Sequence, residues 1–203
     1  DEATDPGKRV QKSSAFGYPQ LVLGMIAIFV YVGVEVSTIS NMPAYLELPV
    51  SEGGLGIETS LIAPFVSLYW ASLMIGRWAG AAGAFDVAKR TKWMLTVLLP
   101  YLAFGVFLAV NAFANHEISH FFMYGFVIVL MIAATFASRG NPARMLLYFA
   151  ICGIAALVIG MLTTGMTSVV AFISVGLFCS TMWPCIFTLA ITGMALKFSY
   201  AAW

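Results

Sequence analysis

A single acidic residue stands in the middle of the first long apolar stretch of the sequence. That stretch, 21–45, has the length of a membrane-spanning helix, and Glu35 lies near its centre. A charge that faces lipid at this depth costs about 3 kcal/mol or more, so the carboxyl is expected to face a partner, a cavity or a proton. Tyr31 and Thr38 lie one turn away on the same face, and Asn41 lies on a neighbouring stripe. This pattern is typical of the lining of a hydrophilic path. The alternative is that Glu35 forms a hydrogen bond between helices and has no role in transport.

A second charge lies inside apolar sequence. Arg77 falls near the end of the stretch 60–85, and Asp86 is the first residue after that stretch. An arginine side chain is long enough to reach the interface from this depth. Arg77 and Asp86 are therefore candidate gating residues, as a charge latch that holds one conformation of a moving protein. Simple anchoring of Arg77 on the positively charged side of the membrane is the alternative.

A third pattern is that of a zinc site. Residues 116–120, HEISH, match H-E-x-x-H, which on a helix places His116 and His120 on one face as zinc ligands beside Glu117 as general base. An intramembrane zinc metallopeptidase is thus an alternative from another class. However, the chain has only these two histidines, no Asp or Glu follows Glu117, and the motif falls between two apolar stretches. A polar turn is the favoured interpretation, with no metal, no cofactor and no catalytic residue expected.

Two tryptophans lie well inside apolar stretches. Trp70 and Trp183 are placed to stack on a sugar ring, or else to pack within the bundle. The three cysteines, Cys152, Cys179 and Cys185, have neither disulfide nor metal spacing and are interpreted as packing residues.

The composition indicates what kind of protein must position these residues. Of 203 residues, 61% are hydrophobic and 9% are charged, and the mean hydropathy is +0.93. Soluble domains have about 25% charged residues. The chain is therefore expected to be a multi-pass membrane protein with the lipid bilayer as its surroundings. It has no basic patch interleaved with aromatic residues, so no nucleic acid partner is expected.

Six stretches are apolar and long enough to be membrane-spanning helices. Their expected ranges are 21–45, 60–85, 93–113, 120–138, 145–164 and 168–196, between a polar segment 1–20 and the last residues 197–203. With the N-terminus in the cytoplasm, every Lys and Arg except Arg77 falls on the cytoplasmic side, and the outer loops carry only acidic charges. The sequence therefore predicts an all-α membrane protein of six transmembrane helices with both termini cytoplasmic.

Two local patterns favour helices that pack closely. Gly76 and Gly80, followed by Gly83, give a small-residue face that lets helices approach one another. Pro184, inside the stretch 168–196, has no N–H to donate to the carbonyl of Ser180 and should kink the helix. Freed backbone groups at membrane depth are tolerated against protein or a wet cavity. A kink that serves only packing and a kink beside a cavity both stay open.

Three separated motifs resemble one group of known proteins. They are YVGVEV at 31–36, YWASLMIGR at 69–77 and LFCSTMWPCIFTLAI at 177–191. Their sequence and order are similar to those of the fucose permease-like sugar:proton symporters of the major facilitator superfamily, especially the bacterial glucose/galactose transporters. The resemblance covers nearly all of 21–195. It places the chain at the C-terminal half of such a transporter, with 1–20 as the cytoplasmic loop that joins the halves.

Two features depart from that group. Fucose permease has one helix between the span that carries the arginine and the span that carries the proline, whereas three are expected here, at 93–113, 120–138 and 145–164. The extra pair resembles an insertion in some glucose/galactose transporters. Relatives also continue through a Gly-Leu-Gly-Lys-like turn into two further helices, whereas this sequence reads GMALK at 193–197 and then ends. The chain thus resembles a truncated half, and a non-functional fragment is a second alternative.

The resemblance implies secondary active transport of a hexose of the glucose, galactose or fucose type, with no enzyme activity. Transport would be coupled to a cation, expected to be a proton, by alternating access in a bacterial inner membrane. The implied partners are the sugar, the cation and the N-terminal half of the same transporter.

The resemblance also assigns roles to residues. The Gly76-Arg77 pair resembles the cytoplasmic gating motif of the superfamily, and the Glu35 face would supply sugar contacts. The residues expected on the sugar path are Glu35, Tyr31, Thr38, Asn41, Trp70 and Trp183.

Overall fold

The fold consists of helices joined by short connections. The computed structural model describes residues 15–81 and 87–199, and within these ranges it contains α-helices and 3-10 turns and no strand. The α-helices are α1 (Pro19–Glu47), α2 (Ala63–Ala81), α3 (Lys89–Phe113), α4 (Tyr124–Ser138), α5 (Pro142–Leu162), α6 (Gly165–Cys179) and α7 (Met182–Ser199). Within the same described ranges, six segments are long and apolar enough to cross a membrane, and Gly165–Thr192, made of α6 and part of α7, is one of them. The predicted all-α membrane fold of six spans is confirmed.

Several helices begin earlier than the apolar pattern indicates. α5 begins at Pro142, because a proline in the first turn loses no hydrogen bond, and Asn141 caps it. The Asn141 side-chain oxygen accepts hydrogen bonds from the backbone N–H groups of Ala143 (2.9 Å) and Arg144 (3.2 Å). α3 likewise begins at Lys89, ahead of its apolar part. The hydrophobic pattern marks the hydrocarbon-spanning part of a helix, and the polar first turn lies outside that part.

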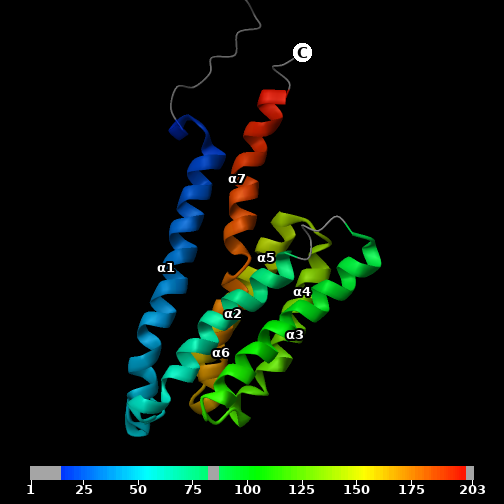
Figure 1. Ribbon diagram of the computed structural model, residues 1–203. Coiled ribbons are helices and arrows are strands. Elements are labelled where there is room, and N and C mark those ends of the chain that lie inside the picture. The colour runs from blue at the N-terminus through cyan, green and yellow to red at the C-terminus, as the bar shows by residue number, and fades with distance from the viewer. Residues whose placement is uncertain (1–14, 82–86, 200–203) are drawn as a thin grey trace, which may run out of the picture.

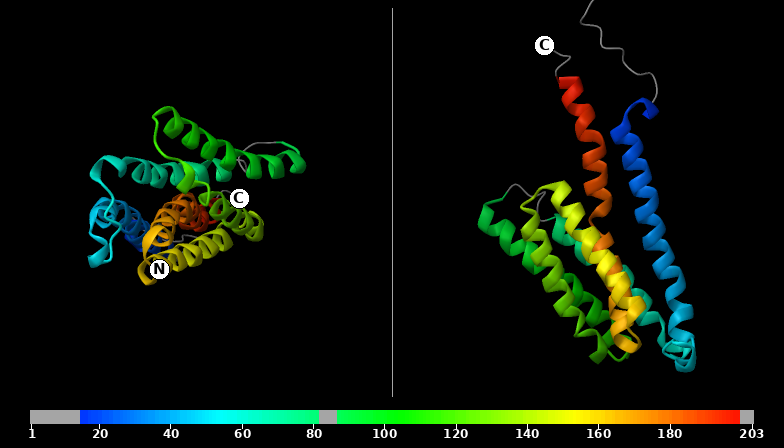
Figure 2. Two further views of the ribbon diagram at one scale, coloured as in Figure 1. Left: turned by 90° about the horizontal axis from the view of Figure 1, so that it is seen from below. Right: turned by 180° about the vertical axis from the view of Figure 1, so that it is seen from behind.

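The helices form two groups that differ in tilt and reach. α1 and α7 pack side by side and extend together beyond the other helices, at the end of the molecule where α1 begins and α7 ends (Figures 1 and 2). α2, α3, α4 and α5 form an inclined group, with α6 packed against α2 and α5 and also contacting α1. α6 is therefore the central helix of the bundle.

Small residues allow α2 to cross the end of α6 at close range. A Cβ atom added to Gly76 would lie 1.8 Å from Ser180 Oγ and 2.6 Å from Ser180 Cβ. At Gly80 the nearest atom would be Thr181 Cγ2, at an ordinary 3.5 Å. The expected close approach is thus confirmed at Gly76, whereas Gly83 lies outside the described residues.

The sixth predicted span is broken, not merely bent. α6 ends at Cys179, Ser180 and Thr181 form a turn, and α7 begins at Met182, so the expected single helix over 168–196 is corrected to two. Pro184 falls in the first turn of α7, where its missing N–H is tolerated. The disturbance expected from Pro184 therefore lies one turn before it, at Ser180.

Candidate functional site

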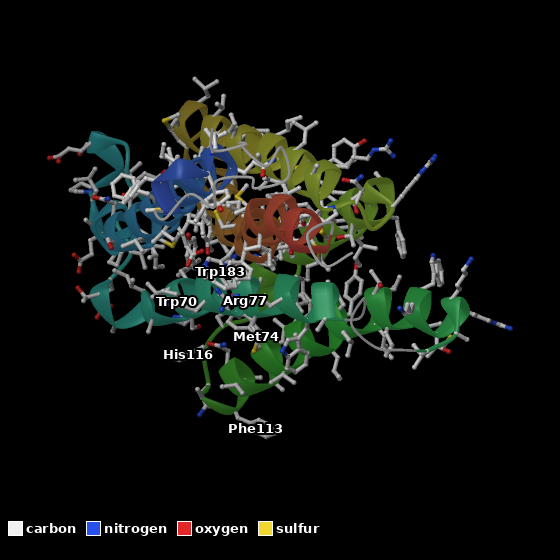
Figure 3. The ribbon with its side chains drawn as sticks, turned by 90° about the horizontal axis from the view of Figure 1, so that it is seen from above. Trp70, Met74, Arg77, Phe113, His116 and Trp183 are labelled. Carbon is white, nitrogen blue, oxygen red and sulfur yellow. The ribbon has the colours of Figure 1, made fainter. Side chains whose placement is uncertain are left out.

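A cavity of about 1230 Å³ opens at the side of the bundle where α2 and α4 end and α3 and α5 begin. Three of the candidate residues line it: Tyr31 of α1, Arg77 of α2 and Trp183 of α7. In the view of Figure 3, Arg77 and Trp183 lie near each other between α2 and α7. Ser180 and Thr181 also line the cavity. The break between α6 and α7 is therefore part of its wall.

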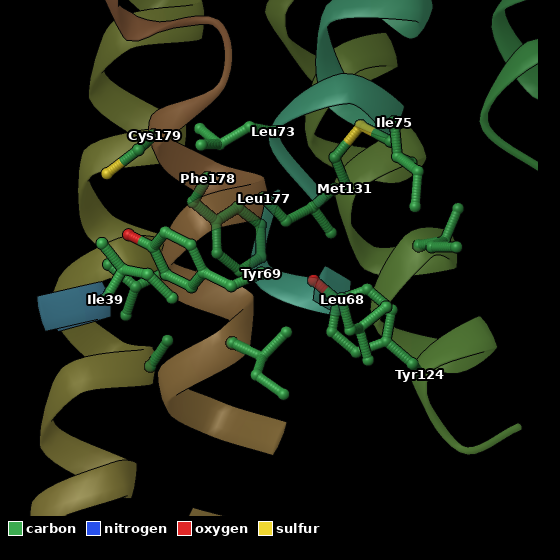
Figure 4. Close-up of a cluster of buried hydrophobic side chains, with 14 of the residues drawn as sticks. Ile39, Leu68, Tyr69, Leu73, Ile75, Tyr124, Met131, Leu177, Phe178 and Cys179 are labelled. Atoms are coloured by element: carbon green, nitrogen blue, oxygen red, sulfur yellow. The ribbon is translucent and has the colours of Figure 1, made fainter. Parts of the chain in front are cut away.

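Glu35 lies beside this break, half-buried on α1. The Tyr69 hydroxyl donates a hydrogen bond of 2.8 Å to the Glu35 backbone carbonyl and so ties α2 to α1 at this level. Figure 4 shows Tyr69 and Cys179 among the buried side chains around the end of α6. Cys179, the last residue of α6, lies within range of the Glu35 charge. The carboxyl thus faces the α6–α7 junction and not lipid.

Two buried oxygens near the junction have no hydrogen-bond partner. Among the described residues, Glu35 Oε2 and Thr181 Oγ1 are the buried side-chain polar atoms without one. Buried polar groups are otherwise almost always paired, so such atoms mark places where a ligand, an ion or water is to be expected. Tyr31 lines the cavity, and its side chain is hydrogen-bonded to the Glu35 side chain. Tyr31 therefore connects the Glu35 carboxyl, whose Oε2 atom has no partner, to the cavity.

A helix break at membrane depth suits the recognition of a polar ligand. The break places the N-terminus of α7, the positive end of its helix dipole, directly after Ser180 and Thr181. Trp183, 47% exposed, stacks on Phe187 at a centroid distance of 5.3 Å and presents an aromatic wall. A carboxylate, hydroxyl groups and an aromatic face can together hold a polyhydroxylated molecule by hydrogen bonding and ring contact.

Four residues predicted for the sugar path are not part of the cavity lining: Glu35, Thr38, Asn41 and Trp70. The Thr38 hydroxyl donates to the Val34 carbonyl at 2.8 Å, and the Asn41 amide donates to the Ser37 carbonyl at 2.8 Å. Both side chains are thus bonded to their own helix. Trp70 is 51% exposed and packs edge-on against Tyr69 with ring centroids 6.0 Å apart.

The gating pair can be described only in part. Arg77 is exposed and lines the cavity, whereas Asp86 lies outside the described residues. No carboxylate of the described chain is within ion-pair distance of Arg77. The latch between the two residues stays a prediction.

Sequence reasoning missed three residues of the cavity lining: Ser180 and Thr181 at the junction, and Thr188 further along α7. Pro184 could have indicated Ser180 and Thr181, because a proline inside a span disturbs the helix about one turn before it.

The H-E-x-x-H pattern does not form a zinc site. Residues 116–118 are irregular and Ser119–Phe121 is a 3-10 turn, so the required α-helix is absent from this described segment. His116 Nδ1 lies 3.2 Å from Asn111 Oδ1, and His120 Nε2 lies 3.7 Å from a Glu117 carboxylate oxygen. Within the described ranges no three metal-ligating side chains gather. The favoured interpretation, a polar turn, agrees with this geometry.

Comparison with known proteins supplies the family context. No protein-family model matches the chain. No solved structure matches it either. Similar curated proteins include the glucose/galactose transporters of Brucella abortus biovar 1 (strain 9-941) and of Brucella abortus (strain 2308). Each is 30% identical over 184 residues, which are 91% of this chain and 31% of the relative.

The chain therefore spans about 31% of the length of these curated relatives. Most of its own length is nevertheless covered by the similarity. The resemblance to bacterial glucose/galactose transporters that the three motifs indicated is thereby confirmed.

Proposed function

We propose that this chain forms one wall of the sugar path in a transporter that moves a hexose across a bacterial inner membrane by alternating access. Coupling to a proton, or to another cation, supplies the driving force, and the N-terminal half of the same transporter supplies the opposite wall. The substrate class follows from the relatives, which are glucose/galactose transporters. The six candidate spans support a multi-pass membrane protein.

One observation of the structure carries this proposal. Glu35 keeps a buried carboxyl oxygen without a partner, and Tyr31, to which its side chain is hydrogen-bonded, lines the cavity beside the broken span. An unpaired polar atom at this depth is costly unless a ligand uses it. A sugar hydroxyl that donates to Glu35 Oε2 would satisfy it, and Thr181 Oγ1 would bind a second hydroxyl.

The aromatic and charged residues have separate roles in this proposal. Trp183 presents its ring to the apolar C–H face of the sugar, which orients the hydroxyls toward Glu35. Tyr31 is hydrogen-bonded to the Glu35 side chain and lines the same cavity as Arg77. Arg77, at the cavity wall of α2, gates the path by pairing with a carboxylate, for which Asp86 is the candidate. Thr38, Asn41 and Trp70 would contact sugar only in another conformation.

Uptake of labelled hexoses into proteoliposomes by the full-length protein tests the proposal. We expect saturable uptake that an inward proton gradient stimulates. Glu35→Gln should retain uptake because the amide still hydrogen-bonds to hydroxyls, whereas Glu35→Ala should abolish it. Loss with both variants, alongside surviving sugar exchange, would move Glu35 from sugar binding to proton coupling. A folded protein that takes up no hexose under any gradient would contradict the proposal.

A further inference from the structure

Positive charge is concentrated at the end of the large cavity where α2 and α4 end and α3 begins. Arg77, Lys89, Lys92 and Arg139 all line it, and they come from α2, from the first turn of α3 and from the end of α4. Among the described residues, no Asp or Glu contributes to the lining. The hexose path has no need of so many cations, because a hexose is uncharged. This region therefore calls for an anionic ligand.

Three of these four cations have no acidic partner among the residues that the structure describes. In the described chain, Arg77, Lys89 and Arg139 form no ion pair with a carboxylate. Pro142, at the N-terminus of the 21-residue helix α5, also lines the cavity, so the positive end of that helix dipole adds to the field. Like charges held together around one space repel each other unless an anion or water screens them.

The wall next to these charges is apolar and aromatic. Trp93, 58% exposed, stacks on Phe136 with ring centroids 5.8 Å apart and an interplanar angle of 23°. Met145 extends the same lining. Tryptophan near a helix end beside lysine is typical of the boundary between headgroups and hydrocarbon. The region thus joins a cationic rim to an apolar surface.

We propose that this region binds an anionic phospholipid of the leaflet that the positive-inside rule assigns to the cytoplasmic side. The lipid phosphate contacts Lys89, Lys92 and Arg139, and its acyl chains cover Trp93 and Phe136. A free phosphate ion would match the charges and leave that aromatic wall uncovered, so the lipid is the better fit. Basic pockets between transmembrane helices on this side are known to accept anionic headgroups.

Basic residues on this side also set membrane orientation, and the chain offers a matched control for that role. Arg90 follows Lys89 on α3, and Arg144 lies in the first turn of α5. Both are exposed on the same side of the bundle and neither lines the cavity. Removing them changes the charge of this face without touching the proposed site.

The test is native mass spectrometry of the full-length protein with added phosphatidylglycerol, phosphatidylcholine or inorganic phosphate. We expect phosphatidylglycerol to remain bound, phosphatidylcholine not to bind, and inorganic phosphate not to displace the lipid. Each lysine or arginine near an anionic lipid surface strengthens binding about fivefold, so Lys89→Gln with Lys92→Gln and Arg139→Gln should weaken it on the order of a hundredfold. Arg90→Gln with Arg144→Gln should leave it unchanged.

Three outcomes would overturn the proposal. Equal loss in the control variant would assign the binding to overall charge, and displacement by inorganic phosphate would assign the site to a soluble anion. Unchanged binding in the triple variant would place the lipid elsewhere. Quenching of Trp93 fluorescence by brominated phosphatidylglycerol, compared with Trp93→Phe, provides a second measurement in case the triple variant folds poorly. If the site exists, the Trp93→Phe protein shows less quenching than the unchanged protein.

Discussion

α6 and α7 are two consecutive halves of one predicted span, and their surroundings differ sharply. Most of α6 is buried: Ser168, Val169, Ala171, Ile173, Ser174, Val175, Gly176, Leu177, Phe178 and Cys179. Among the α7 side chains that the structure describes, large exposed ones are those of Trp183, Phe187, Leu189 and Ile191. The break at Ser180 and Thr181 therefore separates a half that holds the bundle together from a half that lines the cavity.

The contrast explains how one span serves two purposes. α6 is enclosed by α2 and α5, with Phe178 packed edge-on against Phe149 at a centroid distance of 5.9 Å. The Tyr124 hydroxyl donates to Ser72 Oγ at 2.7 Å, and Ser72 donates onward to the Leu68 carbonyl at 2.6 Å. The polar groups of the core are thus internally paired, unlike Glu35 Oε2 and Thr181 Oγ1 at the junction.

The largest effect on stability is expected from Phe178→Ala. Phe178 is 2% exposed, so its removal leaves a cavity and should lower the free energy of unfolding by about 3 kcal/mol. The Phe187 side chain on α7 is 46% exposed, so Phe187→Ala should change the free energy of unfolding little. Thermal unfolding of the purified full-length protein measures both. Equal destabilisation would remove the distinction between the two half-spans.

A somewhat smaller loss is expected from Gly76→Ala. The new Cβ would collide with Ser180 and force α2 away from the junction, at a cost of about 2 kcal/mol. Gly33→Ala is the matched control, because nothing lies within 4 Å of a Cβ at that helical glycine. Thermal unfolding of the two variants measures the difference. A Gly76→Ala protein as stable as the Gly33→Ala protein would show that the close crossing of α2 is not required.

Tyr69→Phe should cost about 1 kcal/mol, because it removes the hydroxyl that donates to the Glu35 carbonyl. Tyr101→Phe removes an exposed hydroxyl that donates to the Gly125 carbonyl at 3.2 Å and should cost less. Chemical denaturation of the two variants under identical conditions measures the difference. The opposite ranking would contradict the role of Tyr69 in holding α1.

The smallest effect on stability is expected from Thr181→Val. Its hydroxyl has no partner in the described chain, so the isosteric valine should leave thermal stability unchanged or slightly higher. Hexose uptake should instead require a higher sugar concentration for half-saturation, since a ligand hydrogen bond is lost. Strong destabilisation with unchanged uptake would make Thr181 a structural residue.

Much of the fold could be predicted from the sequence, because spans are set by length and apolarity. The disturbance at Pro184 also followed from local chemistry, since proline has no N–H to donate. The direction in which each helix face points could not be predicted. In a membrane the core and the lipid are both apolar, so the sequence lacks the pattern that separates inside from outside in soluble proteins. Trp70 was therefore placed on the sugar path, although it does not line the cavity.

Polar residues on helices raised a related difficulty. Thr38 lies on the same face as Glu35 and Asn41 on a neighbouring stripe, yet the side chains of both bond to carbonyls of their own helix. Threonine and asparagine have this local alternative, whereas a mid-span carboxylate does not, because the helix offers it no free N–H group. Only the Glu35 side chain was therefore obliged to find a partner elsewhere.

Cysteine accessibility tests most directly whether the cavity face of α7 is the sugar path. Thr188 lines the cavity, and Leu189, one residue further on the same helix, is exposed without lining it. Each is replaced by cysteine in full-length protein whose native cysteines have been removed, and a membrane-impermeant maleimide is added with and without hexose. The account predicts that Thr188→Cys reacts, that hexose slows this reaction, and that Leu189→Cys reacts little. Labelling of Thr188→Cys that hexose does not change, in protein that still transports, would contradict it.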